Sequence, residues 1–318
     1  MRFSQKQAHL VNNPEFKFNS KDLLNIHKDT QLDFLKSSKI QLVNPKDFKL
    51  TEYNYDLFSK IRQKYLKIDL YSSLIKVSNY YKMINLISEK GGRSSAFVFV
   101  TSDKQLVIKT ISKHEYNTFK NRLLHNYARR VLENEESRLV KIFAVLYLNQ
   151  FDQYLIIMEN LIYKKEESLI FDLKGSKVGR NVKDIETPLS PPKGTVLKDV
   201  NFTEFGFKLK LDDETKDKTM KNLFEDFCIL KDSGIMDYSV LLGIRYGEKC
   251  LEDNRGSLVD LDGFVVTLGI IDMFQEYNIK KIGEKTVKSL FNNPQEVSSI
   301  NPEQYFHRIS DFIKTIFL

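Results

Sequence analysis

The spacing of apolar residues changes along the first half of the chain. Between Asp47 and Lys67, apolar and aromatic residues recur at helical spacing, which predicts one or two amphipathic helices. The pattern then becomes typical of strands. Ala96–Val100 and Gln105–Ile111 have the composition of β-strands, and residues 101–104 between them have the chemistry of a turn. We therefore expect a β-hairpin at this point.

A helix and two more strands are expected after the hairpin. Ser112 and Glu115 form a capping box, which predicts a helix of roughly 20 residues. Leu139–Leu148 and Gln153–Glu159 have the composition of strands. The order strand, strand, helix, strand, strand is typical of an antiparallel sheet with one helix packed on it.

The second half of the chain alternates between helical and strand patterns. Three prolines indicate a loop over Asp184–Asp199. Asp213–Asp232 and Glu303–Phe317 carry apolar stripes at helical spacing. Tyr238–Tyr246 and Phe264–Ile271 are apolar and predict two strands joined by a polar loop.

These elements predict an α+β fold of two lobes, built from antiparallel sheet with packed helices. Residues 1–45 are polar, rich in Asn and Lys, and weakly patterned, which indicates an N-terminal extension with one helix near Ser20–Leu35. We assign residues 46–160 to a first lobe and residues 161–318 to a second, with the crossover near Met158–Leu161.

Composition narrows the class of protein. The chain has 318 residues, of which 42% are hydrophobic, enough for a large core. Only two cysteines occur, which excludes a disulfide scaffold and indicates a reducing compartment. No apolar run is long enough to span a bilayer, and the start lacks the apolar block of a signal peptide, so membrane contact would be peripheral. The net charge of +7 favours nucleic acid, anionic lipid or nucleotide, although solubility alone also explains it.

A lysine on an apolar strand is the first candidate for chemistry. Lys109 follows a Gly/Ser turn that includes Gly92 and Ser94, and such a turn can place backbone N–H groups on phosphate oxygens. Strand alternation puts Lys109 on one face with Val107 and Ile111. A lysine on a buried face needs an anion, which a nucleotide phosphate would supply. The alternative is a strand lysine that extends its ammonium to water.

A basic turn and two isolated aspartates are the other candidates. Small residues separate Lys174, Lys177 and Arg180, which suits an anion site; the alternative is a solvated basic turn. Asp237 and Asp272 each stand in an apolar stretch, where an unpaired carboxylate is costly. They indicate Mg²⁺ or a substrate hydroxyl, or else two capped turns. With Lys109 they meet the residue requirements of phosphoryl transfer.

At these residues the chain resembles the phosphatidylinositol phosphate kinase family. The strings FDLKGSKVGR, IMDYSVLLGI and LGIIDMFQEY carry the resemblance, which continues through residues 106–110, 158–161 and 301–313 and covers residues 47–313. It implies a fold distantly related to protein kinases. It also implies transfer of the γ-phosphate of ATP to an inositol ring, with ATP and Mg²⁺ as cofactors.

The resemblance also implies roles for individual residues. Lys109 matches the lysine that holds the ATP α- and β-phosphates. Asp237 matches the aspartate that orients or deprotonates the inositol hydroxyl, and Asp272 matches the metal-binding aspartate. Lys174 and Arg180 match positions that meet the lipid phosphate. The remaining implied nucleotide contacts are Gly92 and Ser94 in the Gly-rich turn and Glu159, Asn160 and Leu161 in the adenine-contacting hinge.

Two positions leave alternatives open, and a third departs from the family. Glu115 matches a glutamate that pairs with Lys109 in the family, but the capping box explains it as well. Ser95 replaces the second glycine of the Gly-rich turn, which motivates a catalytically weak lipid-binding scaffold as an alternative. Arg245 replaces a histidine common in the family. A nucleic-acid binder is motivated by charge alone and lacks a recognition motif, so no nucleic acid is expected.

The segment Gln275–Asn293 bears on the choice of lipid. Its lysines form a basic amphipathic stretch that suits an anionic phosphoinositide membrane surface, or else a solvated helix face. By resemblance, Glu284 favours phosphatidylinositol 4-phosphate, phosphorylated at its 5-hydroxyl. Lys281 matches one of the family's paired lysines, and Ile282 stands at the second position. A type III-like kinase acting on the 3-phosphate lipid is the alternative. We expect a peripheral protein on the cytoplasmic face of membranes, and a homodimer stays open. The four lysines are Lys280, Lys281, Lys285 and Lys288.

Overall fold

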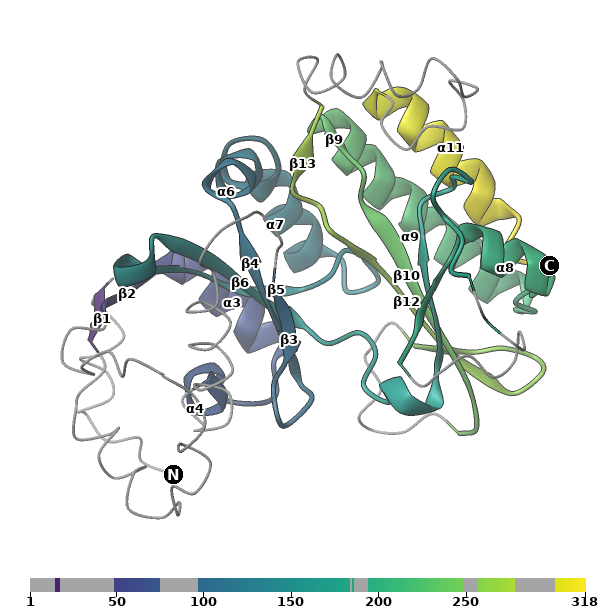
Figure 1. Ribbon diagram of the computed structural model, residues 1–318, viewed down its shortest axis with the longest axis horizontal. Coiled ribbons are helices and arrows are strands. Elements are labelled where there is room, and N and C mark those ends of the chain that lie inside the picture. Colours follow the sequence, from purple (N-terminus) through teal and green to yellow (C-terminus); the bar gives the residue numbers. More distant parts are fainter. Residues whose placement is uncertain are drawn as a thin grey trace. The chain divides into compact units, whose positions relative to one another are not determined.

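The computed structural model describes residues 15–17, 49–74, 97–183, 185, 194–248, 257–277 and 301–318. These residues form a mixture of helices and mainly antiparallel sheet, which confirms the predicted α+β class (Figure 1). The contacts divide the chain into two units. Unit 1 comprises Met1–Lys113 and Lys141–Asn160, and unit 2 comprises His114–Val140 and Leu161–Leu318.

Unit 1 is built on a six-stranded antiparallel sheet in the order β1-β2-β5-β6-β4-β3. The predicted hairpin is present: in its turn, the Thr101 N–H donates to the Leu106 carbonyl at 2.9 Å and Lys104 has a φ of 59°. The elements of this unit are β1 (Glu15–Lys17), β2 (Lys49–Tyr53), α3 (Tyr55–Tyr65), α4 (Leu70–Leu74), β3 (Val98–Val100), β4 (Leu106–Ile111), β5 (Ile142–Leu148) and β6 (Gln153–Glu159).

The segment 47–67 differs from the helices predicted for it, because its first part is the strand β2. Thr51 pairs with Tyr147 of β5, and the Tyr53 ring stacks on Tyr154 at 6.0 Å. The helix α3 then follows, held to the sheet by Arg62, which donates to Glu52 at 2.6 Å. Aromatic residues fit either element, and here strand pairing with a distant segment decided the outcome.

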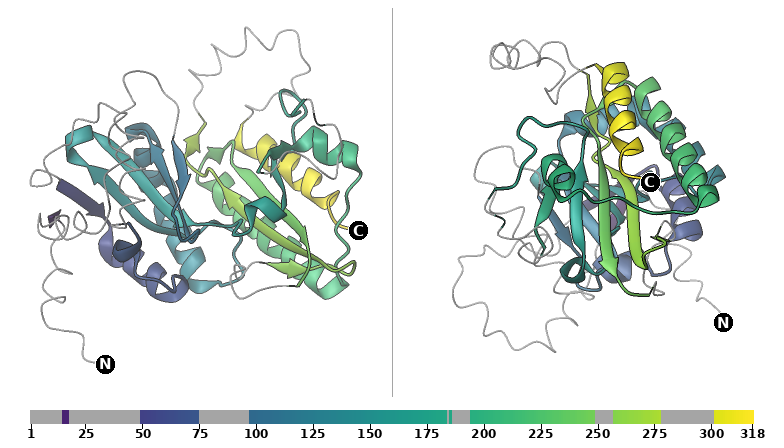
Figure 2. Two further views of the ribbon diagram at one scale, coloured as in Figure 1. Left: turned by 60° about the horizontal axis from the view of Figure 1, so that its bottom comes forward. Right: turned by 90° about the vertical axis from the view of Figure 1, so that its right-hand side faces the viewer.

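Unit 2 contains a five-stranded sheet in the order β11-β12-β10-β7-β8, antiparallel except for β7 with β8. The long helices α9 and α11 lie side by side in each view (Figure 2). The strands of unit 2 are β7 (Leu169–Leu173), β8 (Val196–Lys198), β9 (Ile235–Met236), β10 (Ser239–Tyr246), β11 (Leu258–Val259), β12 (Phe264–Ile271) and β13 (Gln275–Glu276). Of these, β9 and β13 pair with each other outside the five-stranded sheet. The α-helices of unit 2 are α6 (Lys113–Thr118), whose first residue ends the first segment of unit 1, α7 (Leu124–Glu133), α8 (Asp199–Phe205), α9 (Asp213–Asp232) and α11 (Pro302–Lys314), with a π-helical turn at Phe119–Leu123.

The core of unit 2 joins these two helices to the start of β10. Tyr238 is fully buried, and its ring lies 5.7 Å from Phe227 of α9 and 4.8 Å from Tyr305 of α11. Among the described helices, none is long and apolar enough to cross a membrane.

The observed division differs from the expected lobes at residues 114–140, which group with unit 2 rather than with the first lobe. The reason is a buried polar connection. Arg130 of α7 donates to Asp226 of α9 at 2.6 Å, and the Val140 N–H donates to the Ile270 carbonyl of β12 at 3.0 Å. The predicted loop 184–199 also differs, because its end forms β8. Residues 184 and 186–193 of that loop lie outside the described part.

Candidate active site

Three of the residues singled out from the sequence lie at one end of the unit 2 sheet. Ser239, the first residue of β10, pairs with Ile271, the last residue of β12. Leu173, the last residue of β7, pairs with Val240. Lys174 directly follows β7, Asp272 directly follows β12, and Asp237 lies two residues before β10. Strand register therefore places all three at the same end of the sheet.

Both aspartates occupy a break between two strand pairs. On one side Ser239 pairs with Ile271, and on the other Met236 of β9 pairs with Gln275 of β13. Asp237 and Asp272 have φ values of 60° and 62°, in the left-handed region that aspartate tolerates better than most residues. These two turns interrupt the ladder and leave each carboxylate partly exposed.

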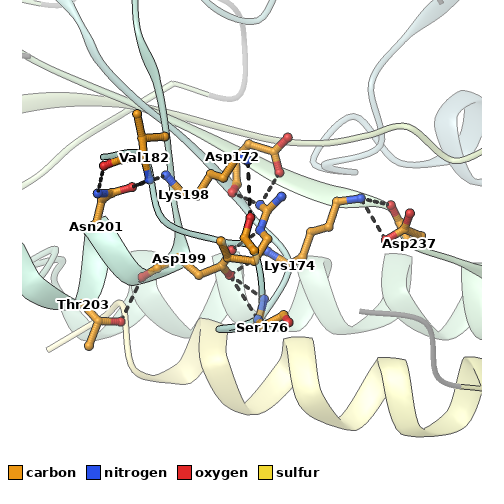
Figure 3. Close-up of polar contacts among 12 residues, drawn as sticks. Asp172, Lys174, Ser176, Val182, Lys198, Asp199, Asn201, Thr203 and Asp237 are labelled. Atoms are coloured by element: carbon orange, nitrogen blue, oxygen red, sulfur yellow. Dashed lines mark hydrogen bonds and ion pairs between the residues drawn. The ribbon is translucent and has the colours of Figure 1, made fainter. Parts of the chain in front are cut away.

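The Lys174 ammonium contacts both the carboxylate and the backbone carbonyl of Asp237 (Figure 3). The ammonium lies 3.0 Å from Asp237 Oδ1 and donates to the Asp237 carbonyl at 2.6 Å. The Lys174 side chain is 14% exposed and that of Asp237 is 32% exposed, so the pair is only partly screened by water. Lys174 therefore fixes the orientation of the carboxylate.

The turn after β7 is organised by Asp199, the first residue of α8. Asp199 Oδ1 accepts the backbone N–H groups of Lys174 at 2.8 Å and Gly175 at 2.7 Å, and Oδ2 accepts Arg180 Nε at 2.6 Å. Arg180 Nη2 also lies 2.7 Å from Asp172 Oδ1. Burial lowers the Arg180 pKa, but the charge of Asp172 and the hydrogen bond with Asp199 outweigh burial, so the pKa is raised. Arg180 is thus fully charged and lies between two carboxylates.

Gly175 packs against the backbone of α11. Its φ is 67°, and a Cβ atom there would lie 2.9 Å from the Arg308 carbonyl oxygen and 3.1 Å from the Ile309 Cα. Both the backbone conformation and the close approach require glycine. The helix therefore supports the turn that carries Lys174.

The same helix also supports the turn that carries Asp237. The Tyr305 hydroxyl donates to the Tyr238 carbonyl, next to Asp237 in the chain. Burial raises the pKa of Tyr305 well above its ordinary value, so the hydroxyl remains a donor. The Arg308 guanidinium lies 4.8 Å from the centre of the Tyr305 ring. Sequence reasoning missed Tyr305 and Asp199 as supporting residues; the resemblance through residues 301–313 was the available signal for Tyr305.

In unit 1, Lys109 lies on β4 between Val98 of β3 and Ile156 of β6. Its side chain and that of Val107 are half-buried, whereas Leu106 and Ile108 on the opposite face are buried. Lys109 is therefore on the more exposed face of the strand, where an ammonium can stay hydrated or bind an anion.

Two of the predicted hinge residues, Glu159 and Asn160, are bonded within unit 1. The Glu159 N–H donates to the Lys141 carbonyl at 2.9 Å, and Glu159 Oε1 accepts the Lys141 N–H at 2.7 Å. Burial raises the pKa of Glu159. The Asn160 N–H donates to the Gln105 carbonyl at 3.1 Å. Leu161 belongs to unit 2, where it packs on Gly269 of β12; a Cβ atom on that glycine would lie 2.6 Å from Leu161 Cδ1.

Of the other residues singled out from the sequence, the structure describes Glu115 and Arg245. Glu115 lies in the first turn of α6, and Arg245 is buried, with its guanidinium donating to the Glu248 carbonyl at 3.1 and 3.2 Å. Other residues singled out from the sequence lie outside the described part of the chain: Gly92, Ser94, Ser95, Lys280, Lys281, Glu284, Lys285 and Lys288.

The carboxylate of Asp272 fits a magnesium ion that arrives with phosphates. Within the described residues, no group of three or more His, Cys, Asp or Glu side chains could hold a metal. Mg²⁺ is commonly held by one or two carboxylates together with substrate phosphates and water. The single, partly exposed carboxylate of Asp272 meets that requirement.

Comparison with known proteins decides the family. The family model described as Phosphatidylinositol-4-phosphate 5-Kinase matches residues 81–260 and 255–316. The chain belongs to this family. The matched range includes the Lys174 turn, Asp237, Asp272 and α11, so the site described above lies within the part of the chain that the family model matches. The resemblance inferred from the sequence is confirmed at this level.

The relatives that the chain resembles are named for different substrates. The chain is 27% identical over 279 residues to a phosphatidylinositol 4-phosphate 5-kinase of Plasmodium falciparum, covering 75% of this chain and 16% of that protein. It is 26% identical to phosphatidylinositol 4-phosphate 5-kinase 6 of Arabidopsis thaliana, covering 86% and 46%. It is also 26% identical to phosphatidylinositol 5-phosphate 4-kinase type-2 gamma of Danio rerio, covering 90% and 83%. Overall identity therefore does not distinguish the two specificities.

Proposed function

We propose that this chain is a lipid kinase that transfers the γ-phosphate of ATP to the inositol ring of a phosphatidylinositol monophosphate. The observation that supports it most is the Asp237–Lys174 pair, which lies at the same end of the sheet as Asp272 in a member of this family. A carboxylate held by a neighbouring cation, next to a second carboxylate, provides a proton acceptor and a metal ligand in one place.

The reaction follows from these groups. The inositol hydroxyl oxygen attacks the γ-phosphorus while the bond from that phosphorus to the β–γ bridging oxygen breaks, and the bonding electrons leave with ADP. The hydroxyl proton passes to the Asp237 carboxylate, whose orientation Lys174 holds. Asp272 would hold Mg²⁺, which neutralises charge on the ATP phosphates when bound. Lys109 and residues 159–161 bind ATP in this proposal, as the resemblance implies.

The lipid proposed is phosphatidylinositol 4-phosphate, phosphorylated at its 5-hydroxyl. Glu284 supports this by resemblance, and two relatives carry that activity in their names. The second candidate is phosphatidylinositol 5-phosphate, phosphorylated at its 4-hydroxyl, which the relative from Danio rerio favours. We further propose peripheral attachment to the cytoplasmic face of an anionic membrane through Lys280, Lys281, Lys285 and Lys288.

Direct lipid labelling tests the proposal. The purified chain is incubated with γ-labelled ATP, Mg²⁺ and vesicles that contain the 3-, 4- or 5-phosphate lipid, and the position of the new phosphate is determined. Label in the 4-phosphate lipid at the 5-position, lost in Asp237→Asn, is the expected result. Vesicle binding without label in any lipid would favour the non-catalytic scaffold.

A further inference from the structure

We propose that Asp199 is a positioning residue of the candidate active site, because its carboxylate sets the turn from which Lys174 reaches Asp237. The inference rests on the proposed function, which places Lys174 and Asp237 at the reacting groups. Asp199 itself would touch neither substrate nor ATP. Its effect would pass through the backbone of the turn that carries Lys174.

One buried carboxylate binds several consecutive backbone groups. Asp199 is 2% exposed, and its Oδ1 accepts the N–H groups of Lys174, Gly175 and Ser176 at 2.8, 2.7 and 3.4 Å (Figure 3). Consecutive N–H groups that converge on one anion form a cradle, and hydrogen bonds to a charged acceptor are the stronger kind. The backbone of this turn is therefore shaped around the Asp199 carboxylate.

Lys174 connects this anchor to the reacting carboxylate. Its N–H is held by Asp199 Oδ1 at 2.8 Å, and its ammonium lies 3.0 Å from Asp237 Oδ1 at the other end of the same side chain. A shift of the backbone therefore displaces the ammonium. In catalysis a misplacement of about 1 Å can lower the rate about 100-fold.

Arg180 balances the charge that this arrangement buries. Its Nε lies 2.6 Å from Asp199 Oδ2, and its Nη2 lies 2.7 Å from Asp172 Oδ1. A buried carboxylate is tolerated only when paired in this way. Asp199 is fully engaged by these bonds, which leaves it a supporting role rather than direct contact with a substrate.

Asn201 provides a matched control on the same helix. It is 3% exposed, and its Oδ1 accepts the Val182 N–H at 3.0 Å while its Nδ2 donates to Asn181 Oδ1 at 2.8 Å. It stabilises the neighbouring loop as a second buried polar centre of α8, but makes none of the bonds to residues 174–176. Loss of Asn201 thus imitates general damage to α8 without releasing Lys174.

The experiment compares the wild type with Asp199→Ala, Asp199→Asn and Asn201→Ala. Three measurements are made below the melting temperature of each variant: kcat and KM per folded molecule, hydrogen exchange of residues 174–176, and the rate at which an amine-specific reagent modifies Lys174. Asn at position 199 can still accept the N–H groups through Oδ1, but its NH₂ group would face Arg180 Nε. It therefore serves as the conservative variant.

We expect Asp199→Ala to lower kcat about 100-fold with little change in the KM for ATP. Exchange at residues 174–176 and modification of Lys174 should both become faster. Asp199→Asn should be intermediate, and Asn201→Ala should match the wild type in all three measurements. Equal kcat and equal Lys174 reactivity in Asp199→Ala and Asn201→Ala would overturn the inference.

The last two measurements do not depend on activity. An inactive wild type would therefore refute the proposed function while the exchange and modification rates still decide the role of Asp199. Unchanged rates in Asp199→Ala would overturn that role even if the wild type is an active lipid kinase.

Discussion

The Lys174 ammonium lies 3.0 Å from Asp237 Oδ1 and donates to the Asp237 carbonyl at 2.6 Å, so one cation holds both the side chain and the backbone of the same aspartate. The two residues are 63 positions apart in sequence. The contact depends on β7 and β10 being neighbours in the sheet, with Leu173 opposite Val240.

Asp237→Asn should lower kcat about 10²- to 10⁴-fold, because an amide cannot accept the hydroxyl proton. The substitution preserves shape, and Lys174 can still bind the backbone carbonyl, so the melting temperature should change little. Asp262→Asn is the control, since the Asp262 carboxylate is exposed and forms a surface ion pair with Lys210 at 2.7 Å. Near-normal lipid labelling by folded Asp237→Asn would remove Asp237 from the catalytic role.

Asp272→Asn should lower lipid labelling about 100-fold and raise the Mg²⁺ concentration needed for half-maximal rate. The metal would lose a charged ligand, while the side chain keeps its size. The measurement is a Mg²⁺ titration at saturating ATP, with thermal unfolding to establish that the variant is folded. The same Mg²⁺ dependence as the wild type would show that another residue holds the metal.

Gly175→Ala should destabilise the protein more than Gly179→Ala does. Both glycines have a φ of 67°, so each substitution costs about 1–2 kcal/mol of backbone strain. A Cβ atom at Gly179 meets nothing within 4 Å, whereas one at Gly175 would press on the Arg308 carbonyl of α11. That contact should cost about 1–3 kcal/mol more. Urea denaturation of the two variants measures the difference, and equal stabilities would argue against close packing of α11 on this turn.

Glu284→Ala should shift the preference from the 4-phosphate lipid towards the 5-phosphate lipid, by resemblance to the 4-kinase type. The 3-, 4- and 5-phosphate lipids are labelled side by side with the wild type and the variant. An unchanged ranking would mean that Glu284 does not select the lipid here, and the 5-kinase proposal would lose its main support. ATP hydrolysis without lipid serves as the control, because it should be the same in both proteins.

Local patterns predicted those elements whose signals lie within a few neighbouring residues. The hairpin turn at 101–104 is set by Asp103, whose Oδ1 accepts the Thr101 hydroxyl at 2.6 Å and the Gln105 N–H at 3.2 Å. The helix Asp213–Asp232 was predicted from its apolar stripe with its observed bounds. In the structure Asp212 caps its start, and Gly234 follows its end in the left-handed conformation. The candidate residues Lys174, Asp237 and Asp272 were also identified from sequence alone.

Only tertiary structure decided how those residues are supported. The residues Lys49–Tyr53 became a strand because β5 offered a partner, although their aromatic spacing also suits a helix. Asp199 was assigned to the end of a loop, yet its carboxylate binds a turn 25 residues earlier in the chain. Arg180 fits the pattern of an exposed basic turn, but Asp172 and Asp199 bury and pair it. A sequence shows which side chains can ionise or donate, whereas burial and the choice of partner depend on segments brought together by long-range strand pairing and helix packing.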